Sequence, residues 1–130
     1  MGAWVWRKRP TGWQVTDGDT GWRRVPFPAA LALPDDSLNR LNVRRSGGLV
    51  TARVQINSVG GRPTIWTLPD GWRDSLHWST AGHNYMWGNG AGIQLNRANG
   101  ANDLQAQSGK WHLSWQTDDP WPTTLPGTPA

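Results

Sequence analysis

The fold of this chain is decided by residues 41–57, which read LNVRRSGGLVTARVQIN. Leu41, Val43 and Arg45 occupy one set of alternating positions, and after Gly47-Gly48 apolar residues again recur at every second position. Period-two alternation on both sides of a glycine-containing turn predicts a β-hairpin with one buried face. We expect this hairpin to be the best-ordered unit of the protein.

The composition favours strands over helices throughout the chain. The 130 residues fit one domain, and they include no Glu, two Lys, 16 Gly and 10 Pro. Cysteine is absent, which excludes a disulfide framework and a thiolate metal site. No apolar run approaches the roughly 20 residues of a membrane span, and the basic residues 7–9 follow apolar ones, the reverse of a secretory signal. We expect no helix longer than two turns and no membrane insertion.

Further short strands surround the hairpin, separated by Gly, Asn and Pro. In the last one Trp111, Leu113 and Trp115 share a face. Short strands with such turns predict an all-β fold, an antiparallel β-sandwich resembling a jelly roll. Asp17-Gly18-Asp19 is predicted to be a turn, since a calcium loop would need further carboxylates downstream. The expected strands are 3–6, 13–16, 64–67, 76–79, 85–87, 93–96, 103–107 and 110–117.

The sequence suggests three consecutive parts. Residues 1–25 hold N-terminal strands, residues 26–118 the β-sandwich domain, and residues 119–130 an extended Pro-rich tail in which proline prevents ladder formation. Trp4 and Trp6 lie on one side of an extended strand that is too short to bury them. The first part therefore either completes a sheet of its own domain or pairs with a partner chain. Our hypothesis is that it docks the protein onto a larger assembly.

No arrangement of residues in the sequence indicates an enzyme. His77 and His83 match no zinc spacing, and His112 stands alone. The adjacent pairs Asp35-Asp36 and Asp118-Asp119 would point to opposite faces of a strand, so they do not flank one substrate bond. Neither a nucleophile elbow nor a P-loop occurs. The net charge of +4 is spread over Arg residues interspersed with Asp, which does not favour nucleic acid. We expect no catalysis, metal, cofactor or nucleic-acid partner.

The 11 Trp residues are the most unusual feature of the composition. Trp72, Trp111 and Trp115 are predicted to belong to the core. A Gly- and Asn-rich stretch instead places aromatic rings beside amide and imidazole groups, a mixture that suits a sugar ring. The alternative is that these rings anchor subunit contacts. The candidate glycan-binding residues are Trp78, His83, Asn84, Tyr85 and Trp87, and the candidate assembly residues are Trp4, Trp6 and Trp121.

Several of these stretches together resemble a pattern found in tailed phages. Residues 41–51 and the turn at 65–73, reading IWTLPDGWR, are similar to the C-terminal, receptor-facing domains of tail-tip and minor tail proteins, and Asp74 stands where the pattern usually continues with Pro. The lead-in at 18–23 and the endings at 115–122 and 125–127 resemble the corresponding parts of that domain in phages of actinobacteria.

The resemblance implies a β-sandwich, usually a homotrimer, in the virion tail. Such a protein would be made in the host cytoplasm, assemble with other phage tail proteins and contact the host surface, where it would bind a cell-envelope glycan. Two alternatives stay open. One is a purely structural tail or decoration subunit without a ligand, and the other is a free carbohydrate-binding module.

Overall fold

The computed structural model describes residues 4–9, 12–33, 38–61, 63–73, 93–96 and 103–130. Strands dominate these residues, and the single helical turn among them is η1, so the predicted all-β fold is confirmed. No helix in the described ranges has the length and apolar character to span a membrane. The elements are β1 (Trp4–Arg9), β2 (Gly12–Gly18), β3 (Arg23–Val25), η1 (Ala29–Leu31), β4 (Arg40–Ser46), β5 (Leu49–Ile56), β6 (Thr64–Thr67), β7 (Ile93–Asn96), β8 (Asp103–Ala106), β9 (Gly109–Gln116) and β10 (Thr128–Pro129).

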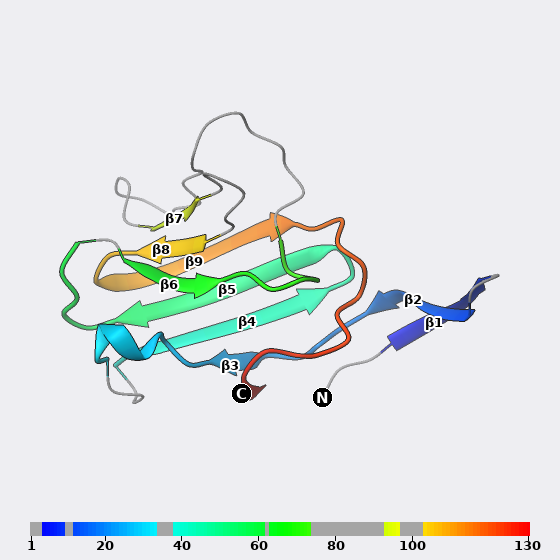
Figure 1. Cartoon of the computed structure of the whole chain (residues 1–130), viewed down its shortest axis with the longest axis horizontal. Helices are drawn as coiled ribbons and strands as arrows, with labels where there is room; N and C mark the ends of the chain where they lie inside the picture. The colour runs from blue at the N-terminus through cyan, green and yellow to red at the C-terminus, as the bar shows by residue number, and fades with distance from the viewer. Residues whose placement is uncertain (1–3, 10–11, 34–37, 62, 74–92, 97–102) are drawn as a thin grey trace.

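The strands form three antiparallel sheets. One sheet has five strands in the order β10-β3-β4-β5-β9, a second has three in the order β6-β8-β7, and β1 pairs with β2 alone. The predicted hairpin is the centre of the largest sheet, with Leu41 opposite Val54 and Arg45 opposite Val50. Gly47, with a φ of 57°, makes the turn between β4 and β5. Figure 1 shows the β1–β2 hairpin beyond the end of the sheet at which this turn lies.

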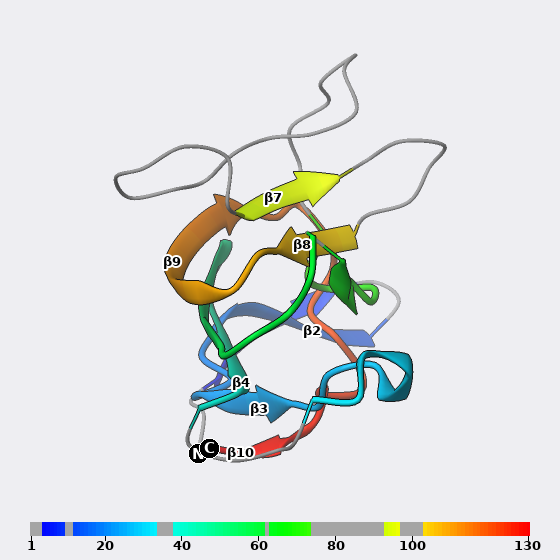
Figure 2. The same cartoon turned by 90° about the vertical axis from the view of Figure 1, so that its left-hand side faces the viewer.

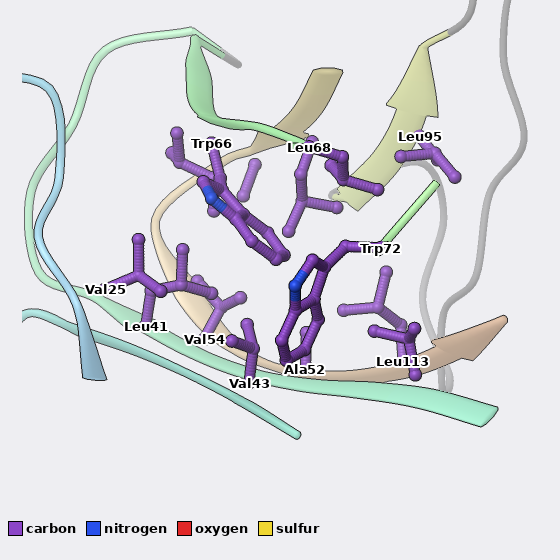
Figure 3. Close-up of a cluster of buried hydrophobic side chains, with 14 of the residues drawn as sticks. Val25, Leu41, Val43, Ala52, Val54, Trp66, Leu68, Trp72, Leu95 and Leu113 are labelled. Atoms are coloured by element: carbon purple, nitrogen blue, oxygen red, sulfur yellow. The ribbon is translucent and has the colours of Figure 1, made fainter. Parts of the chain in front are cut away.

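The hydrophobic core lies between the five-stranded and three-stranded sheets (Figure 2), where β7 and β8 form the upper layer and β4, β3 and β10 the lower one. Alternate residues of β4, β5 and β9 face the core, as the period-two pattern predicted. Trp66 and Trp72 enter the core from the other side. Their ring centroids lie 5.8 Å apart, and the two ring planes are inclined at 67°, an edge-to-face arrangement. Figure 3 shows Trp66, Leu68, Trp72 and Leu95 facing Val25, Leu41, Val43, Ala52, Val54 and Leu113.

The turn predicted at residues 17–19 is wrong. Residues 17 and 18 continue β2, and Asp19 forms a bridge with Ser46, so the predicted turn at 17–19 is extended chain. The cause is Arg44, whose guanidinium binds the Asp19 carboxylate and keeps this segment along β4. The strands that were expected within the described ranges are present, and their ends differ from the expected ones by up to three residues. The strands expected at 76–79 and 85–87 lie outside the described residues.

The C-terminal segment also differs from its prediction. Proline was expected to keep residues 119–130 out of any ladder, yet Thr128 and Pro129 pair with β3. Pairing is possible because β10 is an edge strand, where a proline can be placed without losing a ladder hydrogen bond. The Ala130 N–H donates to the Trp22 carbonyl, 3.0 Å away. The segment thus leaves β9, crosses the end of the sheet and closes against β3 (Figure 1).

Candidate functional site

Three segments that are distant in sequence meet at the end of the sandwich where β4 turns into β5. They are the end of β4 at Arg45, the turn at 68–73, and residues 117–122. Arg45 takes an inward position because β4 alternates, and its side chain replaces the apolar residue expected after Leu41 and Val43. The residue is only 6% exposed. A buried guanidinium at this position needs acceptors from the surrounding chain.

Four backbone carbonyls supply these acceptors. Arg45 Nε donates to Gly47 O at 2.9 Å, and Nη1 donates to Gly71 O at 2.6 Å and to Pro120 O at 3.1 Å. Nη2 donates to Asp119 O at 2.9 Å. Burial lowers the pKa of the Arg45 guanidinium, and the Asp119 carboxylate opposes that shift. Because arginine keeps its proton in proteins, the group acts here as a permanent fork of donors.

Asp119 and Trp121 complete this cluster. The Asp119 carboxylate accepts the N–H groups of Gly71, at 2.9 Å, and of Arg73, at 3.1 Å. The Arg45 guanidinium lies 5.0 Å from the centre of the Trp121 ring, within the range of a cation–π contact. We call Arg45, Gly71, Asp119, Pro120 and Trp121 the Arg45 clamp. The clamp joins the three segments through hydrogen bonds to main-chain groups, so its role is to hold these segments together in the fold.

The turn at 68–73 requires its glycine and its tryptophan. Gly71 has a φ of 95°, and a Cβ there would lie 2.6 Å from the Pro122 Cβ. The Trp72 ring is fully buried, and its carbonyl accepts the Trp115 indole N–H at 2.8 Å. Sequence reasoning identified Trp72 and Trp115 as core residues, and the structure confirms both. Arg45 was not recognised, although its place in the alternation of β4 was the available signal.

A cavity of about 440 Å³ opens beside the clamp, lined by residues 69–71 and 119–124 together with Arg73. Asp70 forms an ion pair with Arg73 at its edge. The Trp121 ring that borders the cavity is already in contact with Arg45. No cluster of three or more metal-ligating side chains occurs among the described residues. Of the two carboxylates that line the cavity, Asp70 pairs with Arg73 and Asp119 accepts backbone N–H groups.

The outer face of the five-stranded sheet carries a second candidate site. Residues directly opposite each other in an antiparallel ladder share a face. One row of neighbours across the sheet is Arg24, Asn42, Arg53 and His112, and the next is Arg40, Gln55 and Lys110. A shallow cavity of about 540 Å³ lies over these rows. The sequence showed scattered Arg residues, and only the strand register brings them together.

The predicted site residues have separate outcomes. Trp78, His83, Asn84, Tyr85 and Trp87 all fall in 74–92, outside the described residues, so the glycan prediction stays a prediction. Trp4 and Trp6 belong to β1. Trp121 contacts Arg45 of its own chain. Trp111 packs against the core and donates its indole N–H to Gln107 O at 3.0 Å, as a core-edge residue does.

Comparison with known proteins adds no relative: the chain matches no protein-family model, no curated protein and no solved structure.

Proposed function

We propose that this chain is a minor tail protein of a tailed phage, which assembles on the virion tail and contacts the glycan of the host cell envelope. The observation that carries the proposal is the Arg45 clamp. Its members come from the stretches 41–51, 65–73 and 115–122, the same three stretches in which the sequence resembles receptor-facing tail domains. A resemblance whose separate motifs meet around one buried arginine is better explained by a shared fold than by coincidence.

The rest of the molecule supports a protein that works by binding. An antiparallel sandwich presents loops and flat faces, and the described residues form no cluster of three or more metal-ligating side chains. Trp78, Tyr85 and Trp87, with His83 and Asn84, remain the residues proposed for glycan contact. They lie in the segment that follows Arg73 and the clamped turn in sequence.

Residues 1–16 are proposed to dock the protein onto the tail, where it is proposed to assemble as a homotrimer. The β1–β2 hairpin is a two-stranded sheet of its own, and Figure 1 shows it beyond the end of the larger sheets. An isolated two-stranded hairpin is marginally stable in water, so a partner surface would stabilise it. This arrangement suits a docking element better than a core strand.

Two measurements on the full chain test the proposal. Purified virions would be examined by mass spectrometry and by immunogold labelling with an antibody raised against the chain. The isolated protein would be mixed with purified cell-wall fractions of the host, sedimented, and assayed in the pellet. We expect the chain at the tail and in the pellet. Its presence at the tail without cell-wall binding would identify a purely structural subunit, and cell-wall binding without incorporation would identify a free carbohydrate-binding module.

A further inference from the structure

Five basic side chains of the described residues lie on the outer face of the five-stranded sheet. We call this surface the basic face and define its charged members as Arg24, Arg40, Arg44, Arg53, Lys110 and Asp19. Its five cations and one carboxylate give the basic face a charge of +4. A surface of this kind attracts polyanions.

The two rows of the basic face alternate cations with amides. Asn42 lies between Arg24 and Arg53, and Gln55 lies between Arg40 and Lys110. Since neighbouring strands are about 4.8 Å apart, the cations of one row are separated by roughly 10 Å with an amide between them. Cations neutralise acid groups, and amides both donate to and accept from hydroxyl groups. The pattern fits a polymer that carries acid groups among hydroxyl groups.

Arg53, at the centre of the basic face, is held in place. Its guanidinium lies 4.5 Å from the centre of the Trp22 ring, close enough for a cation–π contact. Trp22 is half-buried, and its main-chain carbonyl accepts the Ala130 N–H. A cation already stacked on a ring loses less side-chain freedom when it binds an anion. The Asn42 Oδ1 atom next to it is buried and accepts no hydrogen bond from the described residues, an unmet polar group of the kind found at binding sites.

A polysaccharide fits this surface better than a nucleic acid. Sheets that bind single strands stack bases on aromatic side chains of their central strands. The outward residues of β4, β5 and β9 include no Trp, Tyr or Phe, and the one ring among them is the His112 imidazole. The major groove of duplex DNA admits a helix or a two-stranded ribbon, and the face of a five-stranded sheet is too broad to enter it. The cavity of about 540 Å³ is open and shallow, which suits an extended chain lying across the strands.

We infer that the basic face binds an anionic polysaccharide. The inference deepens the proposed function, on which it rests for the source of the ligand: the acidic glycan of the host cell envelope. It assigns recognition of the acid groups to Arg53 and Lys110 on neighbouring strands, and the positioning of Arg53 to Trp22.

Titration of the full chain with defined polymers tests the inference. The probes are polygalacturonate for carboxylates, a phosphomannan for phosphodiesters, uncharged dextran, and a single-stranded DNA oligonucleotide. Arg53→Gln and Lys110→Gln each remove one cation from the basic face, and Arg73→Gln removes one from the exposed turn as a charge-matched control. We expect at least one acidic polysaccharide to bind, with affinity falling about fivefold for each cation removed from the basic face. Arg73→Gln should leave the affinity unchanged, and dextran should not bind.

Trp22→Ala provides a second, charge-neutral test. It should weaken binding of the acidic polysaccharide while the net charge stays constant, because Arg53 loses the ring that positions it. Circular dichroism and the urea midpoint of each variant show whether it is folded. An unfolded Trp22→Ala protein would be replaced by Trp22→Leu, which keeps apolar volume without the ring electrons.

Several outcomes would overturn the inference. They are equal weakening by Arg73→Gln and Arg53→Gln, equal binding of dextran, tighter binding of the DNA oligonucleotide, or no binding of either acidic polymer. Failure of the proposed function is distinguishable from these. If cell-wall binding survives in the Arg53→Gln, Lys110→Gln double variant, the proposed function stands and the basic face is not its site. If the defined polymers bind but virions lack the chain, the basic face stands and the tail assignment fails.

Discussion

Arg44 and Arg45 are adjacent in β4, and the pleat of the strand sends them to opposite environments. Arg45 is buried and donates to four carbonyls, whereas Arg44 is 40% exposed and binds Asp19 at the surface. Removing the first leaves buried acceptors without donors, and removing the second returns a carboxylate to water. The same side chain therefore has very different effects on stability at the two positions.

Arg45→Met keeps an unbranched apolar stem and removes the guanidinium with its five donors. We expect the free energy of unfolding to fall by about 3 kcal/mol or more, because one buried and three part-buried carbonyls lose their donor at once. Arg44→Gln is the matched control, and an exposed ion pair predicts a loss under about 1 kcal/mol. Urea unfolding followed by tryptophan fluorescence measures both. Equal losses for the two variants would mean that the Arg45 clamp does not stabilise the fold.

Asp19 links stability to pH. Its hydrogen bond from Arg44 holds the pKa of the carboxyl below its usual value, with a further lowering by the Gly21 N–H and an opposing contribution from burial. A lowered folded pKa means that the stabilisation is complete above the unfolded pKa of about 3.9 and is lost as the pH falls through the folded value. We expect Asp19→Asn to lower the urea midpoint at pH 7 and to have a smaller effect at pH 2. An equal effect at both pH values would exclude the ion pair as its cause.

Among the elements, β10 depends on a single glycine. Gly127 has a φ of 59°, and a Cβ there would fall on the carbonyl oxygen of Arg24 in β3. Around it, Arg23 donates from Nε to Pro126 O at 3.0 Å and from Nη2 to Gly127 O at 2.9 Å. The closing strand is thus attached where the chain needs a left-handed conformation and close backbone contact.

Gly127→Ala is expected to detach β10 from β3. The backbone conformation alone costs roughly 1–2 kcal/mol for an L-residue, and the overlap with Arg24 adds to it. Gly60→Ala is the control, because a Cβ at Gly60 meets no atom within 4 Å. Limited proteolysis should remove the C-terminal residues of Gly127→Ala faster than those of Gly60→Ala or the unchanged chain. Identical digestion of all three would show that Gly127 is not needed for this attachment.

The elements also show what the sequence could reveal. The β4–β5 hairpin, β6, β7, β8 and β9 were predicted because alternation and glycine turns are local properties. The clamp and the basic face were missed because each depends on register between distant strands. Asp119 was considered only as half of the Asp118-Asp119 pair, and nothing near it in sequence indicates that it would accept the N–H groups of Gly71 and Arg73.

The β1–β2 hairpin stands apart from the sandwich in the molecule as a whole. Deletion of residues 1–16 removes most of that sheet while keeping Asp19 and its bond to Arg44. We expect the truncated protein to fold, as judged by circular dichroism, and to be absent from virions by immunoblotting. An unfolded truncation would show that the segment is needed for the core and would refute its role in docking.

The whole molecule is predicted to form a homotrimer, as closed cyclic assemblies commonly do. Light scattering coupled to size-exclusion chromatography should give three times the 14.4 kDa mass of the chain. A monomer at micromolar concentration would count against the trimer in solution. The same measurement on the deletion variant would show whether residues 1–16 are needed for the trimer.

The strand order has a consequence for how the protein is synthesised. β5, in the middle of the sheet, pairs with β4 on one side and with β9, more than 50 residues later, on the other. The β4–β5 hairpin therefore leaves the ribosome with its β5 edge unpaired. Its apolar face stays uncovered until β9 and residues 117–122 have been made. Such long-range pairing slows folding and exposes an edge that can pair with another nascent chain. A truncated product that lacks the last 25 residues would keep that edge open, so a ribosome that stalls late would release an aggregation-prone species rather than a smaller domain.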